Sequence, residues 1–228
     1  MEKFTLYNPV KVVFGGGRLD DLKKYARSFG KRCFILMGSG SVEKYGYLDR
    51  VKKNLKKSGV EYTVFSGVEP NPRVKTIDRA KKEAYKFKSE FIIALGGGSV
   101  MDGAKGISVS YFTPESSVWD YIIPPRGEKK LKPQKVLPII AIPTVAATGS
   151  EMDGIAVISN GETKQKVSLF SQKIFPELAI VDPELTYSLD KKHTAYGRVD
   201  IITTLIKIYR ASKRRIFLSS PRPRSRLI

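Results

Sequence analysis

The chain has 228 residues, of which 41% are hydrophobic, and it carries a formal net charge of +19 at pH 7. This composition is typical of a globular protein with an apolar core, and apolar runs of only five or six residues exclude a membrane-spanning helix, which needs about 20. The N-terminus carries no apolar signal region and the single cysteine excludes an internal disulfide, so the sequence predicts a cytoplasmic protein without a membrane partner.

The first half of the chain alternates between predicted strands and predicted helices. Strands are expected at residues 10–14, 33–37, 60–65 and 91–95, and helices at residues 19–29, 42–58 and 74–88. A further helix is expected after the glycines that follow the fourth strand, and it should run through about residue 111. The sequence Pro70-Asn71-Pro72 predicts an extended turn, because a residue that precedes proline avoids the helical conformation. Continuous apolar strands between amphipathic helices predict a doubly wound α/β fold with a mostly parallel, Rossmann-like sheet.

The second half has shorter predicted elements. After a loop-rich stretch at residues 114–133, strands are expected at residues 137–142, 155–159, 167–170 and 179–181, with a hairpin turn near Asn160-Gly161. Asp190 or Thr194 is a candidate cap for a helix over residues 191–209. Residues 1–190 are therefore assigned to the α/β domain, and residues 210–228, rich in Arg, Ser and Pro and without acids, are predicted to be a disordered basic tail.

The strongest functional signal is a glycine run, Gly96-Gly97-Gly98, between a buried strand and a helix, followed by Ser99 and Asp102. Glycines at the end of a strand let the backbone approach a diphosphate closely. The N–H groups at the start of the next helix then bind the anion, with help from the helix dipole. A plain tight turn is the alternative, but the longer motif between a strand and a helix is more specific than a glycine run alone.

A second polar segment, residues 143–151, follows a predicted strand directly. Its hydroxyl groups and small side chains leave room for a ligand and supply donors to a phosphate or a nicotinamide. Taken alone, this segment is equally compatible with a polar surface loop.

In this order, with Phe14-Gly15 before them and Val181-Asp182-Pro183 after them, the two motifs resemble the iron-containing (group III) alcohol dehydrogenases, and most closely their butanol dehydrogenase branch. The resemblance covers residues 4–209. Members of that family are nearly twice as long, and their NAD(P)-binding α/β domain is followed by an all-helical domain. The resemblance therefore implies a truncated chain that contains the first domain and only the start of the second.

The resemblance also implies a set of cofactor contacts. Around the pyrophosphate it places Gly97, Gly98, Ser99 and Asp102. Along the phosphate and nicotinamide side it places Thr144, Thr148 and Ser150, and it gives further cofactor contacts to Asn71 and Lys166. NAD-preferring members place an acid after the second strand to accept the ribose hydroxyls. This sequence has Gly38, Ser39 and Ser41 there, with Lys44 nearby, so NADP(H) is predicted in preference to NAD(H).

In the family, one Asp and three His hold an Fe²⁺ or Zn²⁺ ion between the domains, and Asp200 matches that aspartate. The next ligand would be a histidine one helical turn later, but Thr204 stands there. A neutral hydroxyl is a poor ligand for either ion. The only histidine, His193, lies in a basic stretch and is not expected to substitute. Metal binding and catalysis are therefore expected to be lost in this chain.

Three interpretations follow. The favoured one is an alcohol dehydrogenase by descent, acting on a small alcohol or aldehyde with NADP(H), but inactive as this chain. The second is a nucleotide-binding module without catalysis. The least favoured is a nucleic-acid binder through the basic tail, because aromatic residues do not interleave with that tail in a way that would stack bases. An apolar helix surface also predicts a homo-oligomer, through Ile201, Ile202, Leu205, Ile206 and Ile208.

Overall fold

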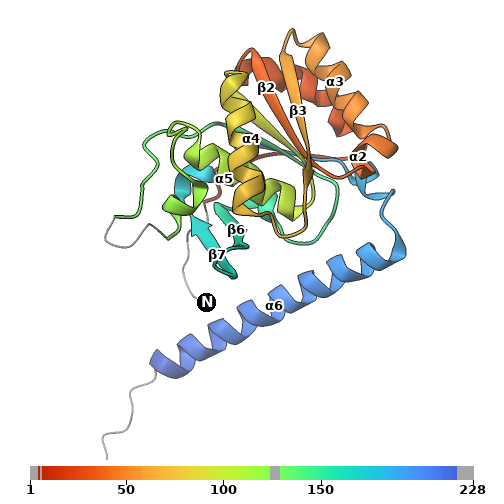
Figure 1. Ribbon diagram of the computed structural model, residues 1–228. Helices are drawn as coiled ribbons and strands as arrows, with labels where there is room; N and C mark the ends of the chain where they lie inside the picture. Colours follow the sequence, from red (N-terminus) through yellow and green to blue (C-terminus); the bar gives the residue numbers. More distant parts are fainter. Residues whose placement is uncertain (1–4, 6, 124–128, 220–228) are drawn as a thin grey trace, which may run out of the picture.

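The computed structural model describes residues 5, 7–123 and 129–219. Side chains are described only as far as residue 210. Six strands form one sheet in the order β1-β8-β5-β4-β2-β3, and every neighbouring pair is parallel (Figure 1). The strands are β1 (Lys11–Phe14), β2 (Arg32–Gly38), β3 (Glu61–Val68), β4 (Phe91–Gly96), β5 (Ile139–Pro143) and β8 (Leu178–Val181). The predicted parallel α/β sheet is confirmed.

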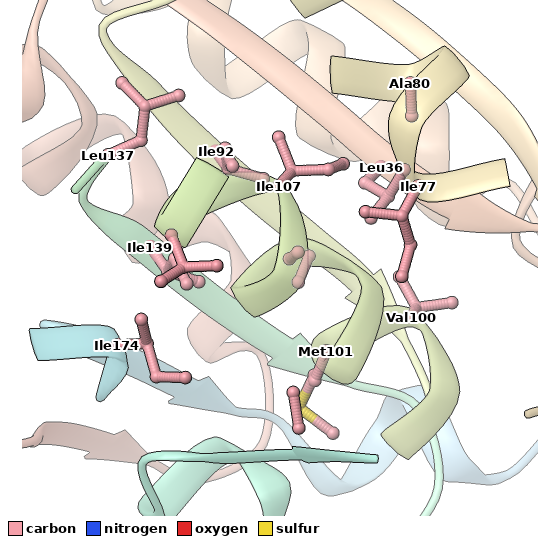
Figure 2. Packing of buried hydrophobic residues seen from close by; sticks show 14 of the residues in the cluster. Leu36, Ile77, Ala80, Ile92, Val100, Met101, Ile107, Leu137, Ile139 and Ile174 are labelled. Atoms are coloured by element: carbon pink, nitrogen blue, oxygen red, sulfur yellow. The ribbon is translucent and has the colours of Figure 1, made fainter. Parts of the chain in front are cut away.

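Helices cover both faces of this sheet. On one face, α1 (Leu22–Phe29) and α3 (Tyr47–Lys57) pack on residues such as Ile35, while on the other α4 (Val74–Lys86) and α5 (Gly98–Ser110) pack on residues such as Leu36. Figure 2 shows the second cluster, in which Leu36, Ile77 and Ile107 meet. Successive side chains of β2 point to opposite faces, so a continuous apolar strand fills both layers of the core.

One predicted helix is divided in two. The sequence favours a single helix over residues 42–58, but the structure has a short α2 (Ser41–Lys44) and then α3. Gly46 lies between them with φ of 72°, a left-handed conformation that glycine adopts without steric cost.

Two segments that are distant in the sequence meet at the edge of the sheet. Phe14 of β1 pairs with Val181 of β8, and the carboxylate of buried Asp182 accepts hydrogen bonds from the N–H groups of Gly17 (3.2 Å) and Leu19 (3.0 Å). These groups open the short helix η1 (Arg18–Asp21), so Asp182 fixes the turn that follows β1.

A separate antiparallel hairpin confirms the turn predicted near Asn160. It consists of β6 (Ile155–Asn160) and β7 (Gln165–Phe170). Short helical turns complete the connections: η2 (Val118–Tyr121), η3 (Ser150–Met152), η4 (Gln172–Ile174) and η5 (Pro183–Thr186).

The last helix, α6 (Lys191–Ser219), lies apart from the domain for most of its length (Figure 1). Asp190 precedes it and accepts a hydrogen bond from the His193 N–H at 2.7 Å, as expected of a cap. The sequence predicts that order ends near residue 210, whereas the helix continues to Ser219, since no proline interrupts it before Pro221. The remainder of the predicted tail, residues 220–228, lies outside the described residues.

Within the described ranges, none of the helices combines the length and the apolar character that crossing a bilayer requires.

Candidate functional site

A cavity of about 460 Å³ lies at the carboxyl ends of three adjacent strands. Gly38 ends β2, Gly97 follows β4 and Thr144 follows β5, and all three residues line the cavity. Open parallel α/β sheets bind their ligands in such a crevice, because the loops that leave neighbouring strands diverge there. Ser41 also lines it, so four residues predicted from the sequence meet in one cavity.

The N-terminus of α5 faces this cavity without a side-chain cap. The helix begins at Gly98, and its cap residue Gly97, which lines the cavity, makes no side-chain hydrogen bond to the first turn. The first N–H groups of a helix have no acceptor one full turn earlier in that helix. Here the Val100 N–H donates to the Gly97 carbonyl at 3.0 Å, which leaves the N–H groups of Gly98 and Ser99 to bind an anion. The predicted order of strand, glycines and helix is confirmed.

Close packing explains why glycines stand here. A Cβ atom at Gly96 would lie 2.7 Å from Val100 Cγ2, and one at Gly98 would lie 2.6 Å from Thr148 Oγ1. Thr148 thus stands against the first turn of α5, and its Oγ1 accepts a hydrogen bond from the Ser150 N–H at 3.2 Å. The two predicted loops are therefore in direct contact.

Asn71, Ser99 and Lys166 form a polar cluster beside the start of α5. The Lys166 ammonium donates to Asn71 Oδ1 at 2.6 Å, and the Asn71 N–H donates to Ser99 Oγ at 3.1 Å. Asn71 has φ of 58°, and Asn is one of the few residues that tolerate this left-handed conformation. The structure thus brings together three predicted site residues that are far apart in the sequence, although none of them lines the cavity itself.

Asp102 and Ser150 belong to a polar network beneath the cavity. Asp102 accepts hydrogen bonds from Ser150 Oγ at 2.8 Å and from the Val157 N–H at 3.0 Å. Lys105, which is 0% exposed, donates to Ser150 Oγ at 2.9 Å and to Asp153 Oδ1 at 2.6 Å. Burial raises the pKa of Asp102 and lowers the pKa of Lys105, while hydrogen bonds and opposite charges act in the other direction. Both oxygens of Asp102 are therefore engaged within the protein.

The opposite wall of the cavity consists of residues that the sequence did not single out as a site. They come from the end of α2, the start of α3, the segment before α6 and the first turn of α6, namely Tyr45, Tyr47, Ser188, Leu189, Asp190 and His193. Lys44, noted above only for its position in the sequence, lines the same cavity. His193 Nδ1 lies 2.9 Å from both carboxylate oxygens of Asp190. No local pattern places residue 190 beside residue 44, so only the tertiary fold reveals this wall. Ser39 is exposed and does not line the cavity.

Among the described residues, Asp200, the predicted metal ligand, has no ligating partners. Asp200 and Thr204 are both exposed on α6. Across residues 5, 7–123 and 129–219, no three His, Cys, Asp or Glu side chains come close enough together to hold a metal ion. The residues present therefore do not fit the metal centre that the family resemblance implies, and no catalytic step through a metal follows from this chain.

Known proteins resemble this chain along most of its length. A model of the family described as iron-containing alcohol dehydrogenase matches residues 9–183. A probable NADH-dependent butanol dehydrogenase of Bacillus subtilis is 37% identical over 209 residues, which are 92% of this chain and 52% of the relative. An NADPH-dependent aldehyde reductase of Escherichia coli is 36% identical over 209 residues, with the same coverage of 92% and 52%.

The fold is also found in solved structures. The crystal structure of an NADH-dependent butanol dehydrogenase A from Thermotoga maritima matches with a TM-score of 0.82 and 38% identity, over 90% of this chain and 50% of that one. The chain thus spans about half the length of the relatives that it matches.

Proposed function

The chain belongs to the iron-containing alcohol dehydrogenase family, and on that premise we propose that it binds the dinucleotide NADP(H) in the cavity at the carboxyl ends of β2, β4 and β5. The observation that carries this proposal is the uncapped start of α5 at Gly97 and Gly98, which faces the cavity. The diphosphate would accept hydrogen bonds from the free N–H groups there, and the helix dipole would add to the attraction.

The polar cluster beside this helix start supports the same placement. Lys166 supplies a positive charge and Ser99 a hydroxyl group, and Asn71 holds both at hydrogen-bonding distance. Thr144, Thr148 and Ser150 would line the path toward the nicotinamide, with Thr144 in contact with the cavity. A charge-assisted hydrogen bond between an ammonium and a phosphate is about twice as strong as a neutral one.

The preference for NADP(H) rests on the charges around the end of β2. Lys44 and Ser41 line the cavity there, and no acid stands at residues 38–41 to repel a 2′-phosphate. The acid that does line the cavity, Asp190, already accepts hydrogen bonds from the backbone N–H and the imidazole of His193, so its carboxylate has partners within the protein. Among the relatives, both NADH-dependent and NADPH-dependent enzymes occur.

We infer further that the reaction class is hydride transfer between a small alcohol or aldehyde and the nicotinamide, as the names of the relatives indicate for those proteins. The bound dinucleotide would supply the hydride chemistry. The residues of this chain would bind and orient it, while Asp200 and Thr204 do not assemble the metal centre that would polarise the alcohol oxygen. We therefore propose that this chain alone binds the cofactor without appreciable turnover.

Fluorescence titration with NADPH and NADH tests the binding proposal. The wild type should bind NADPH with a dissociation constant below about 1 mM and more tightly than NADH. Lys44→Gln should weaken NADPH binding and leave NADH binding nearly unchanged. Lys56→Gln, on an exposed face of α3, is the matched control for charge. A wild type that does not bind NADPH, or a Lys44→Gln variant with unchanged affinities, would contradict the proposal.

Steady-state kinetics tests the absence of turnover. Reduction of NADP⁺ is followed with butanol as substrate and with Fe²⁺ or Zn²⁺ supplied. Turnover within about 100-fold of a full-length relative would show that this part of the proposal is wrong.

A further inference from the structure

The strand β6 pairs with β7 along one edge, and on its other edge, where Ser159 forms an isolated bridge with Arg73, groups are bonded at alternate residues. The Ile155 carbonyl accepts a hydrogen bond from the Lys105 ammonium at 2.8 Å, and the Val157 N–H donates to Asp102 Oδ2 at 3.0 Å. The Ser159 N–H donates to the carbonyl of Pro72 at 2.9 Å. In a strand, alternate residues direct their backbone groups toward the same edge, so these three bonds tie that edge of β6 to α5 and to Pro72.

Two side chains of α5 act here as a neighbouring strand would. Asp102 and Lys105 are three residues apart and therefore lie on the same face of the helix. One supplies an acceptor for a backbone N–H, and the other supplies a donor for a backbone carbonyl. Lys105 is fully buried, and its ammonium has three acceptors, which are Ile155 O, Ser150 Oγ and Asp153 Oδ1. A buried charge with this many partners holds a defined geometry.

The position of β6 determines where Lys166 lies. Lys166 of β7 is the cross-strand partner of Ser159, and its ammonium reaches Asn71 Oδ1 at 2.6 Å. Asn71 in turn donates to Ser99 Oγ in the first turn of α5. The contacts therefore form a closed path that leaves α5 at Asp102 and Lys105 and returns to it at Ser99.

We propose that Asp102 and Lys105 are positioning residues that hold the edge of β6 and thereby place the Lys166 ammonium at the diphosphate of the bound dinucleotide. This inference rests on the proposed function for the location of the diphosphate at the start of α5. It assigns to Asp102 a role within the protein, because both of its carboxylate oxygens are already hydrogen-bonded to Ser150 and Val157.

A double-mutant cycle between Lys105 and Lys166 tests this proposal. Lys105→Met keeps most of the side-chain volume and removes the charge, and Lys166→Ala removes the ammonium near the cavity. Each single variant should weaken NADPH binding by about tenfold, the typical effect of losing a charged hydrogen bond. Because Lys105 acts through Lys166, the double variant should bind within about threefold of Lys105→Met.

Lys81→Met is the matched control. Lys81 of α4 is also buried, and its ammonium donates to the carbonyls of Thr113 and Ser116, which do not line the cavity. This variant should lower the melting temperature but leave NADPH affinity within about twofold of the wild type. Asp102→Asn, which keeps an acceptor oxygen, is the milder variant if Lys105→Met does not fold.

Hydrogen exchange of the hairpin amides gives a second readout that does not require the cofactor. The Val157 amide, which donates to Asp102, should exchange faster in Lys105→Met and Asp102→Asn, and at the wild-type rate in Lys81→Met. The proposal would be overturned if the double variant lost NADPH affinity by the product of the two single losses. It would also be overturned by unchanged exchange at the Val157 amide. If the wild type fails to bind NADPH, the proposed function is wrong, and exchange alone then decides whether α5 positions the hairpin.

Discussion

Thr148 occupies the space that a side chain at residue 98 would need, because a Cβ atom at Gly98 would lie 2.6 Å from Thr148 Oγ1. This contact joins the first turn of α5 to the loop after β5. The closeness of the two backbones, and not only the flexibility of glycine, therefore determines the residue type at position 98.

Gly98→Ala should weaken NADPH binding by about tenfold or more, because the added methyl group displaces Thr148 and crowds the free N–H groups. Fluorescence titration measures the effect. Gly161→Ala is the matched control, since a Cβ there would meet no atom within 4 Å. Equal affinities for the two variants would show that the contact with Thr148 does not matter for binding.

Gly197→Ala should destabilise the protein, although alanine is the better helix former by about 1 kcal/mol. Gly197 is buried in α6, and a Cβ atom there would lie 2.6 Å from the Ala146 carbonyl oxygen. The methyl group would push the helix away from the loop after β5. Thermal unfolding and proteolysis of α6 measure this, and a higher melting temperature would contradict the predicted contact.

The exposed apolar residues of α6 should cause self-association. Ile202 and Leu205 are 55% and 61% exposed, and their neighbours on the helix are similarly uncovered. Replacing both with Lys should shift the chain toward the monomer in size-exclusion chromatography with light scattering. Thr203→Lys, also exposed, controls for the added charge. A wild type that is monomeric at all accessible concentrations would rule this prediction out.

The raised pKa of Asp102 predicts a pH dependence of stability. Burial is the main cause of the shift above 3.8. As the pH rises past that value the unfolded chain ionises first, so the folded state binds more protons and its free energy of unfolding decreases until the raised pKa is passed. The wild type should therefore lose stability relative to Asp102→Asn over this interval. Urea unfolding of both proteins between about pH 3.5 and 7 measures the difference, which would stay constant if Asp102 titrated normally.

Burial also raises the pKa of the Cys33 thiol well above its ordinary value. Cys33 lies in β2 with no exposed surface, so its thiolate form is strongly disfavoured in the folded state. A thiol reagent such as an aromatic disulfide should react only in denaturant. Rapid reaction of the native protein at neutral pH would contradict the buried position of β2.

The sequence by itself determined the parallel sheet, the hairpin and the strand–glycine–helix turn at residues 96–98. These features depend on the local periodicity of apolar residues and on the φ and ψ angles that each residue allows. Both can be read from residues that are neighbours in the sequence. It also indicated the absence of a histidine at Thr204. It could not show that Asp102 is engaged by Ser150 and Val157.

Only the tertiary structure decided which distant residues meet. The contact of Lys166 with Asn71, the burial of Lys105 against β6 and the wall that Asp190 and His193 add to the cavity all join segments separated by tens of residues. Such contacts arise when the sheet closes and its helices pack. Their geometry depends on the whole chain and has no counterpart in any local pattern.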